Sequence, residues 1–234
     1  MLVNNWMTTD IATVGIDDSM ADAIRTMKER SVRMLPVMDG QVLAGVVTDR
    51  DLKRSSASDA TSLEIHELLY LLDRIRMARI MTPEPITVRP DHTLEEAAQL
   101  LLKHRISGLP VVDDRGLVVG VIMQADLFRA LIALTGIEKK GVQFSLELKD
   151  VAGSIREAAD VVRRYGGRII SILSRGGVRP GWRRVYLRVF GIDRVILPDI
   201  VGDIRDCGRL AYMVDHRNDI REIYAVNTGD RNRE

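Results

Sequence analysis

The sequence predicts a mixed α/β protein: two copies of one β-α-β-β-α unit, followed by a third unit of order β-α-β-β-α-β. Two observations support this prediction. Residues 81–129 repeat the pattern of residues 7–54. In addition, the spacing of apolar residues alternates between the period of two expected of strands and the 3.6-residue period expected of helices. At 234 residues, the chain is long enough for one or two domains with real cores.

The internal repeat extends over 48 positions, from residue 7 to residue 54 in the first copy. The offset between the copies is 74 residues and becomes 75 after one extra residue near Asp114. The best-matched segments are Met7-Thr8 with Met81-Thr82, Leu35-Pro36-Val37 with Leu109-Pro110-Val111, and Gly45-Val46 with Gly120-Val121. A duplicated unit tends to pack as a pseudo-symmetric pair, and the cleft between two halves is a natural small-molecule site.

Each copy shows the same order of elements. In the first copy, the segment 11–14 is a short strand candidate, and Asp17-Asp18-Ser19 offers N-caps for a helix that runs to about Arg30. The strands expected at 35–38 and 42–47 form a hairpin around the turn Asp39-Gly40. The second copy has its helix cap at His92-Thr93 and repeats the pattern.

The closing segment of each copy has the pattern glycine, apolar, any residue, Thr or Ser, two residues, Asp. It is Gly45–Asp51 in the first copy and Gly120–Asp126 in the second. With the opening Met-Thr and the Leu-Pro-Val strand, this segment makes each copy resemble a CBS (cystathionine β-synthase) domain. Together the copies resemble a CBS pair, or Bateman module, over about the first 130 residues.

The closing segment of the first copy has the chemistry of a nucleoside site. A strand ends near Thr48 and a helix begins, so backbone amides and the positive end of the helix dipole favour a phosphate there. Thr48 supplies a hydroxyl donor, and Asp51 is an acceptor suited to two ribose hydroxyls. The resemblance implies that these positions bind adenosine-containing ligands. It also implies that the rest of each site comes from the other copy: Thr48 and Asp51 face Ser107 and the segment from Pro83 to Ile86, while Asp126 faces Arg33 and the segment from Thr8 to Ile11.

The two expected sites differ in their donors. The first has both Thr48 and Asp51, whereas the second has Asp126 but Met123 where a hydroxyl is expected. Methionine cannot donate to a phosphate, although Arg33 opposite would be able to clamp one. The alternative interpretation is that both Asp residues only cap the helices that follow them.

The third unit is expected to fold as a four-stranded sheet with two helices. The expected strands and helices are 143–148, 155–165, 168–173, 184–190, 196–207 and 209–215, with a Gly/Pro-rich hairpin loop at 174–182. This order is ferredoxin-like, and with the loop from Asp150 to Gly153 it resembles an ACT domain. The family loop usually reads Asp-x-Pro-Gly, whereas Ala152 stands here at the proline position. The resemblance implies that Asp150 and Gly153 bind an amino acid; a plain strand-to-helix turn is the equal alternative.

The expected division of the chain follows from these units. It is 1–54 for the first CBS unit, 55–77 for a loop and the amphipathic helix Leu63–Ile75, 78–137 for the second CBS unit, 138–141 for a polar hinge, 142–226 for the ACT-like domain and 227–234 for a disordered tail. A CBS pair with a long inter-unit helix and a C-terminal ACT-like domain resembles the AcuB-type proteins of acetoin utilisation.

Composition excludes several other classes. The formal net charge is +1, so bulk charge favours neither nucleic acid nor an acidic membrane, and no apolar run approaches the ~18–20 residues of a membrane span. No signal peptide is visible, and the single cysteine, Cys207, fits a reducing compartment, so the cytoplasm is expected.

The four histidines, His66, His92, His104 and His216, show no metal-ligand spacing. The hairpin arginines Arg175, Arg179, Arg183 and Arg184 are expected to be a solvated basic patch, with an anion or nucleic-acid contact as the alternative.

The predicted function is that of a regulatory sensor without catalytic residues, metal or required cofactor. Its regulatory ligand is expected to be AMP, ADP, ATP or S-adenosylmethionine, and its signal is expected to reach the ACT-like domain or a regulated enzyme partner. A homodimer is expected, because the Leu63–Ile75 helix carries more Leu and Ile than a short insertion needs. Two alternatives remain: an enzyme or enzyme subunit with activity in the C-terminal domain, and a structural dimer with degenerate ligand clefts.

Overall fold

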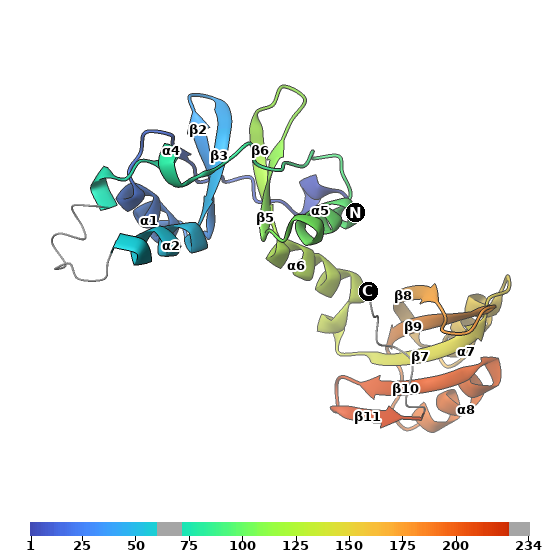
Figure 1. Ribbon diagram of the computed structural model, residues 1–234. Coiled ribbons are helices and arrows are strands. Elements are labelled where there is room, and N and C mark those ends of the chain that lie inside the picture. The colour runs from blue at the N-terminus through green and yellow to red at the C-terminus, as the bar shows by residue number, and fades with distance from the viewer. Residues whose placement is uncertain (60–71, 225–234) are drawn as a thin grey trace. The chain divides into compact units, whose positions relative to one another are not determined.

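The computed structural model describes residues 1–59 and 72–224. The chain divides into two compact units, Met1–Phe128 and Arg129–Glu234 (Figure 1). The amphipathic helix expected at Leu63–Ile75 falls largely outside the described residues, as does the tail from 227 to 234.

The first repeat copy has the predicted order of elements. A 3-10 helix, η1 (Val3–Asn5), precedes β1 (Val14–Gly15), α1 (Met20–Glu29), β2 (Met34–Asp39), β3 (Val42–Thr48) and α2 (Asp49–Asp59). β1 pairs parallel with β2, and β2 pairs antiparallel with β3. The N-cap of α1 is Ser19, which forms a capping box with Asp22 and so satisfies amides of the first turn.

The second copy repeats this arrangement. Its elements are α4 (Met77–Ile80), β4 (Thr82–Pro83), α5 (Leu94–His104), β5 (Gly108–Val112), β6 (Val118–Met123) and α6 (Gln124–Thr135). β5 and β6 form the antiparallel hairpin, and Val88 bridges to Val111 where β1 pairs with β2 in the first copy. Thr93 and Glu96 form the capping box of α5, which matches the box of α1.

The segment that leads into each copy packs on the other copy. Leu2 bridges to Thr93 and Thr8 to Val121, so the N-terminal segment lies against the second copy. The equivalent segment 74 residues later lies against the first copy: Arg76 bridges to Ser19, and β4 pairs with β3. The two copies therefore exchange their opening segments, which ties them into one unit.

Each exchanged segment packs a methionine against a glycine. A Cβ at Gly45 would lie 2.7 Å from Met81 Sδ and 2.8 Å from the carbonyl oxygen of Thr82. A Cβ at Gly120 would lie 2.5 Å from Met7 Sδ. The glycine of the closing segment is thus required at both positions for the close approach of the neighbouring backbone.

The second unit is a five-stranded antiparallel sheet with two helices. Its elements are β7 (Val142–Lys149), α7 (Ser154–Arg164), β8 (Arg168–Gly176), β9 (Trp182–Phe190), α8 (Leu197–Cys207), β10 (Arg209–Asp215) and β11 (Ile220–Ile223). A second 3-10 helix, η2 (Ile137–Lys139), precedes β7. The strand order is β11-β10-β7-β9-β8. The predicted β-α-β-β-α-β order is present, and the unpredicted β11 adds an edge strand beside β10.

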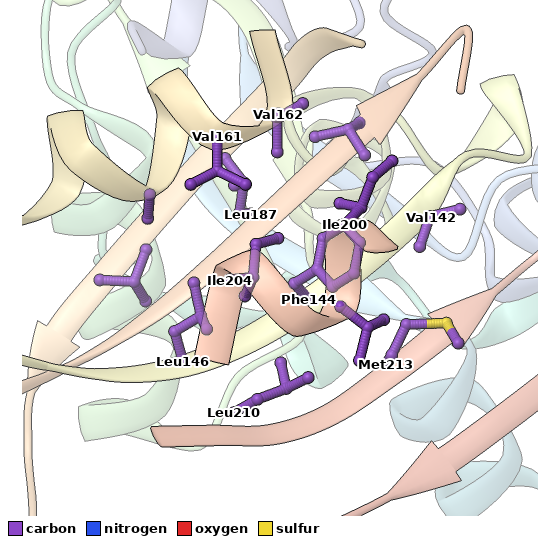
Figure 2. Close-up of a cluster of buried hydrophobic side chains, with 14 of the residues drawn as sticks. Val142, Phe144, Leu146, Val161, Val162, Leu187, Ile200, Ile204, Leu210 and Met213 are labelled. Carbon is purple, nitrogen blue, oxygen red and sulfur yellow. The ribbon is translucent and has the colours of Figure 1, made fainter. Parts of the chain in front are cut away.

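The core of this unit lies between the sheet and helices α7 and α8. Phe144 and Leu146 of β7 meet Val161 of α7 and Ile200 and Ile204 of α8 (Figure 2). All five side chains are buried, so every second residue of β7 faces the helices. Both helices therefore cover the same face of the sheet.

The hairpin between β8 and β9 is longer than predicted. Its pairing continues through Arg175↔Arg184 and Gly176↔Arg183, and the amide of Gly177 donates to the carbonyl of Trp182 at 2.9 Å. The expectation of a solvated arginine patch is wrong for Arg184, which is 3% exposed and pairs with Glu147 at 2.5 Å. The register places Glu147 opposite Arg184, a relation that the local sequence does not reveal.

Asp215, the last residue of β10, carries a buried carboxylate. It accepts hydrogen bonds from Arg194 Nε at 3.1 Å and Nη2 at 2.9 Å, and from the Arg217 amide and Asn218 Nδ2, each at 3.0 Å. Burial alone would raise the pKa of Asp215, but these donors outweigh it and hold the pKa below its usual range.

We therefore expect Asp215→Asn to destabilise the protein by about 3 kcal/mol, because Arg194 loses its charged partner. Since the pKa of the folded state is lowered, the stabilisation by Asp215 is complete above about pH 4 and is lost as the pH falls further. Thermal unfolding between about pH 3 and 7 measures both effects. Asp219→Asn removes the same charge at an exposed site and should leave the unfolding temperature nearly unchanged; an equal loss in both variants would contradict the prediction.

Candidate functional site

Thr48 and Asp51 lie together where β3 ends and α2 begins. Asp51 Oδ2 accepts from the Thr48 amide at 3.0 Å and from Thr48 Oγ1 at 2.6 Å. The Asp51 amide in turn lies 3.4 Å from Thr48 Oγ1. This arrangement is a capping box, so Asp51 caps α2, as the alternative interpretation expects.

The capping role leaves acceptor capacity on Asp51. Its Oδ1 accepts from Arg54 Nη2 at 3.1 Å, and the Arg54 side chain is 76% exposed. A carboxylate has about four acceptor positions, and an exposed arginine is easily displaced because such pairs contribute little. Asp51 is therefore able to accept from a diol while it holds the helix terminus.

The corresponding junction of the second copy is built differently. Asp126 Oδ2 accepts from the Met123 amide at 2.8 Å, and Asp126 is only 3% exposed. The sulfur of Met123 lies 2.2 Å from where a Cβ on Gly108 would be. The thioether thus packs against β5, and residue 123 supplies no hydroxyl to the carboxylate.

The opening segments lie beside both junctions. Pro83 of β4 pairs with Gly45 of the strand that ends at Thr48. Thr8 pairs with Val121 of the strand that leads to Asp126. Ile86 and Ile11, further along each segment, are half-buried. Each junction is therefore adjacent to a segment from the other copy.

Arg33 and Ser107 precede the central strands of the two copies. The Arg33 carbonyl accepts from the Asp49 amide at 3.1 Å, and the Ser107 carbonyl accepts from the Gln124 amide at 3.0 Å. These backbone hydrogen bonds place Arg33 beside the start of α2 and Ser107 beside the start of α6, so each residue lies at the junction of its own copy. The side chains of both are exposed, and their assignment to the opposite junction stays a prediction.

A contact between Met34 and Gly108 joins the two junctions. Met34 pairs with Thr48 and Gly108 pairs with Met123, and Met34 Cε lies 3.1 Å from the Cβ position of Gly108. Sequence reasoning missed this contact and also Arg54. The arginine follows Asp51 by three residues, a helical ion-pair spacing that was available as a signal.

The loop from Asp150 to Gly153 joins β7 to α7. Asp150 Oδ1 lies 2.9 Å from Arg183 Nε, and its amide donates to the Gly181 carbonyl at 2.8 Å. Gly153 is the N-cap of α7 with a φ of +93°, and no atom lies within 4 Å of its Cβ position. The glycine is therefore needed for the backbone conformation, and its surroundings are open.

Within residues 1–59 and 72–224, no group of three or more His, Cys, Asp or Glu side chains is placed to hold a metal ion. Among the helices described, none is both long enough and apolar enough to cross a membrane. Burial raises the pKa of the Cys207 thiol, which disfavours the reactive thiolate.

Comparison with known proteins agrees with the repeat. The family model described as "CBS domain" matches residues 3–58 and 77–133. A CBS domain-containing protein of Dictyostelium discoideum is 30% identical over 133 residues, which cover 56% of this chain and 92% of the relative. The CBS domain-containing protein YhcV of Bacillus subtilis is 31% identical over 125 residues, which cover 53% of this chain and 81% of the relative.

Among solved structures, CBSX2 of Arabidopsis thaliana in complex with AMP is 32% identical, with a TM-score of 0.47 over 56% of this chain and 96% of that one. The family assignment rests on the sequence matches, which cover most of each relative, and on the exchanged β-α-β-β-α copies. This chain belongs to the CBS domain-containing proteins and carries its two CBS domains as a pair.

Proposed function

We propose that this protein is a regulatory sensor, not an enzyme, and that it binds an adenosine-containing ligand at Thr48 and Asp51. The ligand class is an adenine nucleotide or S-adenosylmethionine. The observation that carries the proposal is the Thr48–Asp51 capping box, whose carboxylate has spare acceptor capacity beside a segment from the other CBS domain. We call this junction the Thr48 site and its counterpart at Asp126 the Asp126 site.

The chemistry of the Thr48 site matches each part of a nucleotide. The first amides of α2 and the positive end of its dipole attract a phosphate. A ribose diol replaces Arg54 on Asp51 Oδ1, and Thr48 Oγ1 turns from Asp51 to the phosphate. Pro83 on the adjacent β4 offers an apolar surface to the base.

Asp51→Ala tests the Thr48 site. We expect it to weaken adenine-nucleotide binding by about 1.5–3 kcal/mol, because the ribose loses a charged acceptor. Isothermal titration calorimetry with AMP, ADP, ATP and S-adenosylmethionine measures the change.

Asp22→Ala is the matched control. Asp22 forms the same box with Ser19 and the same ion pair with an arginine three residues later, Arg25. Both substitutions remove a helix cap, so both cost about 1 kcal/mol of stability. Only Asp51→Ala should lose ligand affinity; unchanged affinity in Asp51→Ala, or an equal loss in Asp22→Ala, would sink the site assignment.

The Asp126 site is the weaker of the two in this proposal, because Met123 replaces the hydroxyl and Asp126 is buried. Met123→Thr restores the donor, and we expect a second binding event of raised affinity in calorimetry. Met123→Leu keeps the size of the side chain without a hydroxyl and should behave like the wild type. Identical titrations for both variants would favour the alternative of a structural pair whose second site is degenerate.

The C-terminal unit is proposed as an output or second sensor of ACT type. Its helices and sheet enclose a complete core, and the open surroundings of Gly153 suit a carboxylate at the start of α7. A signal then arises if the ligand binds two arrangements of the CBS pair with different affinities. The link to acetoin metabolism, a cytoplasmic location and a regulated enzyme partner are part of the same proposal.

We also propose a homodimer. In addition to the Leu63–Ile75 segment, α6 exposes Phe128 (63%), Leu131 (53%) and Ile132 (44%), an apolar surface that association would cover. A two-fold pair is the commonest arrangement of identical chains. Light scattering at micromolar concentration should report twice the chain mass of 26.2 kDa, and a monomeric mass would rule the dimer out.

A further inference from the structure

The face of the C-terminal sheet opposite α7 and α8 carries polar side chains in register. Arg188 of β9 is opposite Gln143 of β7, and Ser145 of β7 is opposite Tyr212 of β10. The residues between them along β7 and β9 face the helices (Figure 2). The alternation of strands therefore brings Arg188, Gln143, Ser145 and Tyr212 together on the other face. We call these four residues and His216 the Arg188 cluster.

Arg188 is a buried charge without an acidic partner among the described residues. It is 6% exposed, and its Nη2 donates to the neutral side-chain oxygen of Gln143. Its Nη1 is buried without a hydrogen-bond acceptor. Burial lowers the pKa of Arg188, and no carboxylate opposes this effect. By contrast, Arg184 on the same face pairs with Glu147.

The other members of the cluster also present donors. Ser145 Oγ is fully buried without a partner. The Tyr212 hydroxyl accepts from Gln143 Nε2 at 3.1 Å, so its own proton is available to donate. His216 Nε2 is buried without a partner, and burial together with the charge of Arg188 lowers the pKa of His216.

The buried positive charge of Arg188 requires a negatively charged partner. An arginine cannot lose its proton in a protein, so the cluster cannot relieve its charge by titration of Arg188. A buried charge is strongly unfavourable unless it is paired, and the acceptor of Arg188 Nη2, Gln143 Oε1, is neutral. A guanidinium that has hydroxyl donors on the same sheet face and no carboxylate partner among the described residues matches an anion.

We propose that the Arg188 cluster is a binding site for a small anion that carries a carboxylate or phosphate group. Arg188 Nη1 supplies the charged hydrogen bond, and Ser145 Oγ and Tyr212 Oη supply neutral ones. The ligand is small because Ser145 and Arg188 are nearly inaccessible. This site lies in the C-terminal unit and is separate from the Thr48 site.

The test uses the full-length protein at constant ionic strength, with sodium chloride replaced stepwise by sodium phosphate or by sodium succinate. The unfolding temperature of the wild type should rise with the concentration of one of these anions, because that anion binds only the folded protein. A response to phosphate alone identifies a phosphate ligand, and a response to succinate alone identifies a carboxylate ligand.

Three variants decide whether Arg188 is responsible. Arg188→Gln should abolish the response, and Ser145→Ala should weaken the apparent affinity by several-fold to about tenfold, the effect of one lost hydrogen bond. Arg163→Gln removes one exposed positive charge from α7 on the other face and should respond like the wild type.

The proposal is overturned if the wild type responds to neither anion, or if Arg188→Gln responds as the wild type does. If Arg188→Gln does not fold, Ser145→Ala decides. An affinity for phosphate or succinate equal to that of the wild type would then show that the cluster binds no anion.

Discussion

The structure of the CBS pair depends on the exchange of opening segments between its copies. Thr8 pairs with the closing strand of the second copy, and Thr82 and Pro83 pair with that of the first. Gly45 and Gly120 make this pairing possible, because any side chain there would displace Met81 or Met7. Neither copy has a complete sheet without the other, so the two fold as one unit and share the surroundings of both junctions.

The capping box at Thr48 serves two purposes with the same atoms. It holds the start of α2, and it keeps a carboxylate and a hydroxyl oriented at the helix terminus. In the proposed site, this order lowers the entropic cost of binding, because the Asp51 carboxylate is held in place before a ligand arrives. The box of Ser19 and Asp22 has the same internal geometry. It lies beside Arg76, whereas the Thr48 box ends the strand that pairs with β4.

Much of the fold follows from local signals in the sequence. The helix starts at Ser19 and Thr93 are predictable because a cap satisfies nearby amides. The repeat and the closing motif place Thr48, Asp51 and Asp126 at equivalent junctions. The burial of Arg184 and Arg188 is not predictable in this way, because it depends on the register of β9 against β7. The contact of Met34 with Gly108 also joins residues far apart in the chain.

The additional strand β11 covers one edge of the C-terminal sheet. It has only four residues, all of them exposed, and it covers the edge of β10 with Arg221 and Glu222 in its centre. Without it, β10 would present unpaired backbone groups next to the buried residues Leu210 and Met213. A long apolar edge of this kind recruits strands from other chains, whereas a short, charged one does not. The four residues therefore shield the edge of β10 from pairing with a strand of another chain.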